Sequence, residues 1–371
     1  MEVLSSDQVR AIRLYGQYLN PLDTPRSLVE VVQSLCGVNA QFTPAMLLSL
    51  RARFRGLKVA DVEDAIGGLR TLVRTWAMRG TLHLIATSDM GWMVALLGPH
   101  SILKSKTRLQ ELGLSETILS RGLELLQAVL KRREPLTHDE LGDELQSRGL
   151  VLDWDSQALY HLIHQAAFTG FLCLGEDHRN KDHTFTLVNK WLGKVRPLPE
   201  KEALAELTFR YLKGYGPATP ADLAKWSGLS LTQAKQGWEL FREREPLKEV
   251  KVGDTTFWML DDHPAVDLTP DKPVVNLLPA FDSFVLAYAD RDYLVPEQYQ
   301  KRVFHGGQTV PVILLNGAAA GVWRYERKGK HLNVKIDPFE PFDDPVKICI
   351  ASEVADIGRF FGSLTAITYS A

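Results

Sequence analysis

Two segments of this chain, 82 residues apart, share one pattern, and this repeat most constrains the fold. Residues 135–141 and 217–223 both contain Pro, a small or apolar residue, Thr, two further residues, an acid and Leu. A Thr with an acidic residue three positions later is typical of a helix N-terminus, because the hydroxyl accepts from free backbone N–H groups. The acid also suits the positive helix end. We therefore expect equivalent helices to begin at these two points.

The surroundings of the two segments are alike. Each follows one helical pattern and precedes another, and two alternating, strand-like runs come next. In the first unit these are helices 118–133 and 156–168 with strands 171–174 and 184–188; in the second, helices 201–212 and 231–241 with strands 247–252 and 256–260. Three helices followed by a β-hairpin is the order of a winged helix, a helix-turn-helix variant.

The N-terminal part fits a third copy. We expect helices over 7–18, 27–35 and 44–54, an extra helix over 59–66, and wing strands over 72–76 and 80–85. Ser27 is the expected cap of the second helix, and Pro44 suits the first turn of the third. The alternative is three unrelated helical subdomains.

After Pro270 the pattern becomes β-rich. Strands are expected over 274–278, 310–315, 321–325 and 332–336, with a helix over 352–364. Short strands separated by turn residues are typical of a barrel or sandwich. The fold class predicted is α+β, with tandem winged-helix units followed by a barrel-like domain. The expected boundaries are 1–110, which includes the candidate active-site loop, then 111–198, 199–268 and 269–371.

The charge distribution is uneven. The whole chain has a net charge of -2, but residues 1–110 contain thirteen Lys and Arg against eight Asp and Glu, which makes that part +5 and the remainder -7. A basic face on an acidic protein still releases counterions from DNA phosphates, so binding would be sensitive to salt. The alternative is ordinary variation of charge along a chain.

The cysteines and the apolar segments indicate the compartment. Cys36, Cys173 and Cys349 are far apart and form no C-x-x-C motif, which argues against a disulfide framework or a thiolate metal site. No secretion signal opens the chain, and the longest apolar stretch, residues 90–103, is short and interrupted. We expect a cytoplasmic protein without a membrane partner, associated with the nucleoid when bound to DNA.

Several stretches together resemble the AlkZ/YcaQ-type winged-helix DNA glycosylase family. The stretches are 35–41, 74–83, 277–282, 290–291 and 317–324, and they include the strings Met-Arg-Gly-Thr-Leu-His and Leu-Pro-x-Phe-Asp. The resemblance implies tandem winged helices and a C-terminal β domain around a DNA-binding face. It also implies excision of alkylated bases and, in some members, unhooking of interstrand crosslinks.

The family signature is Gln-x-Gln, His-x-Gln or Gln-x-Asp, and the matching string here is Asn39-Ala40-Gln41. The second position matches, whereas the first has Asn, with a shorter reach. Residues two apart in an extended loop point to the same side, so these two amides can hold a water between them. A cationic alkylated purine departs readily and needs only a placed water. The alternative is that both amides cap the next helix or bind loop backbone.

Basic residues in three places are candidates for DNA contacts. They are Arg51, Arg53 and Arg55 after the third helix; Arg74, Arg79 and His83 on the N-terminal wing; and Arg324, Arg327, Lys328 and Lys330 on a C-terminal hairpin. Such side chains typically bind phosphates and sugars. The alternatives are solvated surface charges and a hydrogen-bonded core histidine.

The sequence does not indicate a cofactor. His161 and His164, with His178 and His183 in the next loop, have spacing that would suit zinc, but no thiolate or carboxylate completes a known pattern. Walker, nucleophile-elbow and dinucleotide motifs are not found. We therefore expect no metal and no cofactor.

Together with the resemblance, these residues predict a monofunctional DNA glycosylase that hydrolyses the N-glycosidic bond of cationic N7-alkylguanine or N3-alkyladenine. Interstrand crosslinks are included among its expected substrates. Its partner would be double-stranded DNA with alkylated bases, and the lack of a long heptad helix predicts a monomer. The alternative is a winged-helix DNA-binding protein without catalysis, with a regulatory or architectural role.

Overall fold

The computed structural model describes residues 2–20, 27–133, 135–154, 156–177, 183–261 and 273–370. The chain forms two compact units, each assembled from non-consecutive segments. Unit 1 comprises Met1–Val62, Ala205–Trp226 and Ser230–Ala371, and unit 2 comprises Glu63–Leu204 and Ser227–Leu229. The four consecutive segments expected from the sequence stay a prediction.

The N-terminal helices begin where the sequence placed them. The elements are β1 (Glu2–Val3), α1 (Ser6–Gly16), α2 (Leu28–Ser34), β2 (Val38–Asn39), α3 (Thr43–Arg53) and α4 (Val59–Glu63). Ser27 caps α2 by accepting from the Glu30 N–H, as expected, and Pro44 lies in the first turn of α3. The extra helix is shorter than expected, because a π-helical turn, η1 (Asp64–Gly68), replaces its end.

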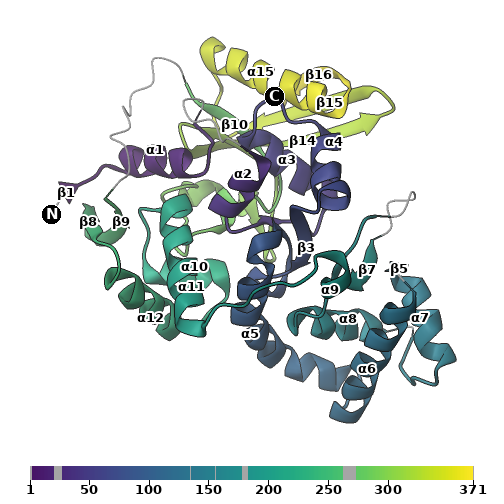
Figure 1. The fold of residues 1–371 in the computed structure, drawn as a ribbon. Coiled ribbons are helices and arrows are strands. Elements are labelled where there is room, and N and C mark those ends of the chain that lie inside the picture. Colours follow the sequence, from purple (N-terminus) through teal and green to yellow (C-terminus); the bar gives the residue numbers. More distant parts are fainter. Residues whose placement is uncertain are drawn as a thin grey trace. The chain divides into compact units, whose positions relative to one another are not determined.

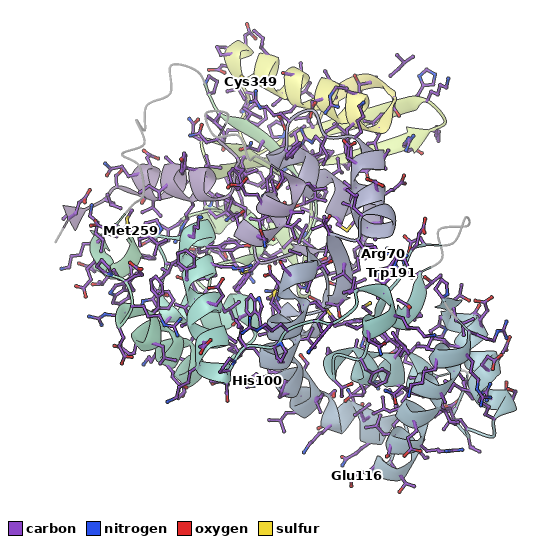
Figure 2. All side chains as sticks on the ribbon, viewed as in Figure 1. Arg70, His100, Glu116, Trp191, Met259 and Cys349 are labelled. Atoms are coloured by element: carbon purple, nitrogen blue, oxygen red, sulfur yellow. The ribbon has the colours of Figure 1, made fainter. Side chains whose placement is uncertain are left out.

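Unit 2 contains one complete copy of the repeat. Its further elements are β3 (Leu72–Trp76), η2 (Met78–Gly80), β4 (Leu82–Ala86), η3 (Thr87–Asp89), α5 (Met90–Glu111), α6 (Glu116–Arg132), β5 (Leu136–Thr137), α7 (His138–Ser147), α8 (Ala158–Phe168), β6 (Leu172–Leu174), β7 (Thr184–Leu187) and α9 (Val188–Trp191). Figure 2 shows Arg70 beside Trp191; the guanidinium lies 3.9 Å from the centre of the indole ring and donates to the Trp191 carbonyl. This contact ties the end of α9 to the loop before β3.

The second copy consists of α10 (Glu200–Tyr215), α11 (Pro220–Ser227), α12 (Leu231–Arg242), β8 (Leu247–Val252) and β9 (Thr255–Leu260). β8 pairs antiparallel with β9 and parallel with β1. Val250 and Phe257 on this hairpin pack against Val9 and Ile12 of α1. Burial of such apolar side chains is the main force that holds α1 to the hairpin.

The two capping signals do start equivalent helices. Thr137 and Glu140 form a reciprocal capping box at α7, and Thr219 and Asp222 form the same pair of hydrogen bonds at α11. The residue before each Thr pairs with the hairpin of its own copy: Leu136 with Phe185 in β7, and Ala218 with Trp258 in β9. The repeat predicted from the sequence is therefore confirmed at these positions.

The C-terminal region is an open sheet rather than a barrel or sandwich. Its elements are β10 (Val275–Leu278), α13 (Ser283–Leu286), η4 (Glu297–Tyr299), α14 (Gln300–Val303), β11 (Phe304–His305), β12 (Gln308–Thr309), β13 (Val312–Leu315), β14 (Ala318–Lys328), β15 (His331–Pro338), α15 (Asp344–Phe361) and β16 (Leu364–Tyr369). The strand order among the described residues is β10-β13-β14-β15-β16, so β10 and β16 form two separate edges.

The long helix explains why this sheet stays open. α15 lies along the sheet (Figure 1), and its Ile350 and Ile357 pack against Trp323 and Ile336. The helix begins at Asp344, earlier than the sequence indicated. It connects β15 to β16, and these two strands pair in parallel. Because a helix supplies the second layer of the core, the sheet can bury its apolar face without closing.

No helix among the described residues has both the length and the apolar character needed to cross a bilayer.

Candidate active site

Asn39 and Gln41 face each other across a short loop. Asn39 ends β2 and is only 8% exposed, whereas Gln41 is exposed just before α3. The Asn39 Nδ2 donates to Gln41 Oε1 at 3.1 Å, and the Gln41 backbone N–H donates to Asn39 Oδ1 at 3.2 Å. Both side chains therefore lie on the same side of the loop, as their spacing predicted.

This contact leaves polar groups of Gln41 for a ligand. The Gln41 carboxamide uses one acceptor position on Oε1 to bind Asn39, and a carboxamide has a second acceptor position and two N–H donors. Asn39 is nearly buried and is itself tied to the Gln41 backbone. Gln41 is therefore the exposed member of the pair, and Asn39 is the nearly buried member that holds the Gln41 side chain.

Arg53 attaches α3 to the Leu-Pro-x-Phe-Asp segment. Its Nη2 lies 2.7 Å from Asp282 Oδ1, and both side chains are 0% exposed. Ser49, one turn earlier, donates to Asp282 Oδ2 at 2.6 Å. Burial alone would raise the pKa of Asp282, but the Arg53 charge and the hydrogen bonds from Arg53, Ser49 and the Phe284 N–H lower it below its usual value. Asp282 is therefore ionised, and it fixes α3 relative to the start of α13.

Arg51 has a similar role on another side of α3. It reaches Glu353 at 3.0 Å and Asp356 at 3.3 Å on α15, and donates to the Leu277 carbonyl of β10. The expectation that Arg51 and Arg53 follow the helix and contact DNA is corrected: both lie within α3 and are buried in ion pairs. Arg55 is exposed beyond the end of α3 and borders a cavity of about 310 Å³.

The two strands expected near residues 72–85 do pair, as β3 and β4, but the basic residues of this hairpin are not all exposed. Arg74 on β3 is buried, and its guanidinium binds Asp177 at 2.6 Å and the Gly175 carbonyl. Burial opposes ionisation of Asp177, yet hydrogen bonds from His183 and Arg74 lower its pKa. The proposed phosphate contact of Arg74 is therefore corrected to an ion pair within unit 2.

His83 is a core histidine. Its ring lies in β4, is buried, and its Nδ1 lies 2.8 Å from the Thr81 carbonyl, to which it must donate. Burial, followed by the nearby charge of Arg79, lowers the pKa of His83 to about 3. The ring is therefore neutral near pH 7 and does not act as a cation toward DNA. The alternative stated for this residue, a hydrogen-bonded core histidine, agrees with its surroundings.

Arg79 does not alternate with Thr81 and His83 on one strand, as the sequence suggested. It lies in the 3₁₀ turn η2 with a positive φ of 55°, which interrupts the strand pattern. The side chain is half-buried at a cavity of about 210 Å³ within unit 2. His100, labelled in Figure 2, borders the same cavity, as do Lys104 and His161.

The C-terminal hairpin is exposed and basic. Arg324, Arg327, Lys328 and Lys330 all lie on β14 or in the turn to β15, with exposed side chains. Arg327 donates to the Phe361 carbonyl, and Lys328 lies 3.0 Å from Glu326. These local contacts still leave the hairpin as a group of cations at the surface.

The histidines considered for zinc are packed among aromatic rings. His161 and His164 lie 5.7 Å apart on α8, and burial lowers the pKa of each, to about 3 for His164. His183 binds Asp177 instead, and His178 lies outside the described residues. In the part of the chain that the structure describes, no group of three or more ligand side chains has a metal-binding arrangement.

Two features of the site were not predicted from the sequence. Asp282 and Phe281 belong to a string that was noted only for its resemblance, and their contacts with α3 span more than two hundred residues. Phe42 directly follows Gln41 and stacks on Phe281. An aromatic residue at the helix cap position, where Ser, Thr, Asp or Asn is usual, was the available signal.

The chain matches known DNA glycosylases over nearly its whole length. The family model described as "DNA glycosylase AlkZ-like" matches residues 32–360, which include the Asn39–Gln41 loop and the C-terminal hairpin. A relative from Streptomyces sahachiroi, named interstrand DNA cross-link repair glycosylase, is 29% identical over 96% of each chain. The solved structure of the Streptomyces sahachiroi DNA glycosylase AlkZ matches with a TM-score of 0.82 and 26% identity over 100% of both chains. The chain described here belongs to the AlkZ-like DNA glycosylase family.

Proposed function

We propose that this DNA glycosylase hydrolyses the N-glycosidic bond of cationic alkylated purines, of the N7-alkylguanine or N3-alkyladenine type. Interstrand crosslinks through such positions belong to the proposed substrates, since a relative is named for their repair. The observation that supports the proposal is the paired amides: Asn39 donates to Gln41 and so orients the Gln41 carboxamide at the surface.

The chemistry needs little more than a placed water. Alkylation at N7 or N3 gives the purine a positive charge, so the base departs as a neutral group and leaves an oxocarbenium-like sugar. The free acceptor position of Gln41 Oε1 accepts a hydrogen bond from the water and aligns the water oxygen with the sugar carbon. As the C–O bond forms, the water loses one proton to solvent. The carbonyl dipole also favours the positive charge of the transition state. A nucleophilic lysine is not required, so the enzyme would be monofunctional.

Asn39 would act through Gln41. In the family signature the first position is Gln or His, which is longer, whereas the Asn39 amide is engaged with both the backbone and the side chain of Gln41. Its role in this enzyme is therefore to hold Gln41 in one rotamer. A held side chain loses less entropy when it binds water in the transition state.

DNA would be held by the repeated helical units and the exposed cations. The element order of α6–β7 and of α10–β9 supports their interpretation as winged-helix units. Of the basic candidates, Arg55, Arg79, Arg324, Arg327, Lys328 and Lys330 remain at or near the surface. Phosphate contacts by such residues would make binding weak on undamaged DNA and steeply dependent on salt. We propose that the enzyme acts as a monomer in the cytoplasm.

A direct test uses duplex DNA with one N7-methylguanine. After incubation with the enzyme, alkali should cleave the strand at the abasic site, and an unmodified duplex should stay intact. A second duplex with an N7-linked interstrand crosslink tests the wider substrate class, because unhooking separates the strands on a denaturing gel. Binding to both duplexes without any release of base would instead support a non-catalytic DNA-binding protein.

A further inference from the structure

An exposed aromatic pair adjoins the proposed catalytic loop. Phe42 follows Gln41 in the chain and is 55% exposed, an unusual position for a large apolar ring. Its ring centre lies 5.5 Å from that of Phe281, and the two ring planes differ by 17°. One side of Phe42 is therefore covered by Phe281, while about half of the residue remains open to solvent.

Phe281 is held in place by its neighbours rather than by a regular element. Its backbone has a φ of 60°, a left-handed conformation that is unfavourable for a residue with a side chain. Its N–H donates to Thr309 Oγ1 at 2.6 Å, and the next residue is Asp282, which Arg53 and Ser49 bind from α3. Strained backbone that surrounding contacts maintain is often found at functional sites.

The same helix thus positions both rings and the catalytic loop. Phe42 precedes the first residue of α3, and Arg53, the last residue of α3, fixes Asp282 beside Phe281. Stacking between the two Phe rings further limits the rotamers of Phe42. The result is a rigid aromatic surface one residue from Gln41.

We propose that Phe42, supported by Phe281, stacks on the alkylated purine when that base leaves the DNA stack. The proposal rests on the proposed function and names a binding subsite for the base. Enzymes that act on a base take it out of the duplex and hold it against aromatic or apolar side chains. An aromatic face also attracts a cation, so this surface favours a purine made cationic by alkylation over neutral guanine.

The test separates binding of the base from its excision. The probe is a duplex with 2′-fluoro-N7-methylguanine, whose glycosidic bond resists hydrolysis, and the reference is the same duplex with 2′-fluoroguanine. The wild type should prefer the cationic base. F42L should lose about tenfold in affinity for the cationic probe, the size of one lost stack on an aromatic side chain, and little for the reference. F42W should retain the preference, because it restores an aromatic face.

Controls distinguish this role from a structural one. Tyr369, an exposed aromatic residue on β16, provides the matched variant Y369L, which should bind both probes as the wild type does. Thermal unfolding shows whether F42L is folded. On cleavable N7-methylguanine, F42L should raise the enzyme concentration for half-maximal single-turnover rate, with less than a threefold change in the maximal rate.

Two results would overturn the subsite. One is equal affinity of folded F42L and wild type for the cationic probe, and the other is an equal loss in F42L and F42W. Failure of the proposed function gives a different result, since the wild type would then release no base while the binding comparison could still be made.

Discussion

Arg53 and Asp282 form a fully buried ion pair, with Nη2 and Oδ1 2.7 Å apart, that joins the end of α3 to the segment before α13. These two residues, 229 positions apart, thus connect the helix that follows the Asn39–Gln41 loop to the segment that contains Phe281. The pair is more than a local contact, because both α3 and the Leu-Pro-x-Phe-Asp segment depend on it for their relative position.

The substitution D282N should strongly destabilise the protein. It leaves the Arg53 charge buried without its counter-charge, and breaking a buried pair from one side typically costs about 3–5 kcal/mol. Chemical unfolding measures the change. Asp344, an exposed residue paired with Lys347 on α15, provides the control D344N, which should change stability much less. Equal effects of the two substitutions would contradict the importance of the buried pair.

The same carboxylate should contribute to acid unfolding. Because the folded pKa of Asp282 is lowered, its ionised form stabilises the protein above the unfolded pKa, and this contribution is lost as the pH falls below about 4. The free energy of unfolding should therefore depend less steeply on pH in D282N than in the wild type below that pH. A slope that is unchanged would assign the acid sensitivity to other carboxylates.

His83 predicts a second pH dependence, at higher pH. Its folded pKa is about 3, against 6.5 for an exposed histidine, so between these values only the unfolded chain is protonated at this residue. The unfolded state then binds more protons, and stability should rise with pH across this window, by about 1.4 kcal/mol per pH unit from one such group.

The variant H83N tests this dependence, since an Asn amide can keep a donor toward the Thr81 carbonyl. Unfolding free energies measured between about pH 4 and about pH 6, inside this window, should vary less in H83N than in the wild type. H305N, on the exposed His305, controls for removal of a histidine. An equal dependence in H83N and the wild type would show that the ring is protonated in the folded protein as well as in the unfolded chain.

The basic residues should separate into two groups when their charge is reversed. R51E and R53E should lower the melting temperature, because both side chains are buried in ion pairs. R55E, R324E and K330E change exposed residues and should leave the protein folded. Each exposed residue that contacts a phosphate should reduce the slope of log affinity against log salt by about 1. Unchanged slopes in all three variants would show that the DNA-binding face lies elsewhere on the molecule.

Q41A should lower the single-turnover excision rate about 10²-fold or more while DNA binding persists, since the side chain acts mainly in the transition state. N39A should have a smaller effect, because it removes the group that orients Gln41 rather than the group that meets the water. N39Q restores the residue typical of the family and should keep or raise activity. Melting temperatures of the same variants are the control, and a normal rate in Q41A would exclude its catalytic role.

Local patterns in the sequence predicted the parts of the fold that depend on neighbours along the chain. The capping signals at Thr137 and Thr219 act within one helical turn, and both helices begin there. The spacing of Asn39 and Gln41 likewise placed their side chains together, because it depends on only three residues of backbone. Alternation of apolar residues also placed β10, β13, β14 and β15 at their approximate positions, whereas β11, β12 and β16 were not predicted.

Only the tertiary structure decided which charges are buried. Arginine is a residue type typical of DNA-binding surfaces, yet Arg51, Arg53 and Arg74 are buried in ion pairs. Their partners Glu353, Asp282 and Asp177 lie 302, 229 and 103 positions away along the chain. A charged side chain is buried only when an opposite charge is buried beside it, and no local sequence pattern specifies which residue that partner is. For the same reason alternation predicted four strands of the C-terminal sheet, but not its fifth strand β16 or the packing of α15 that lets the sheet stay open.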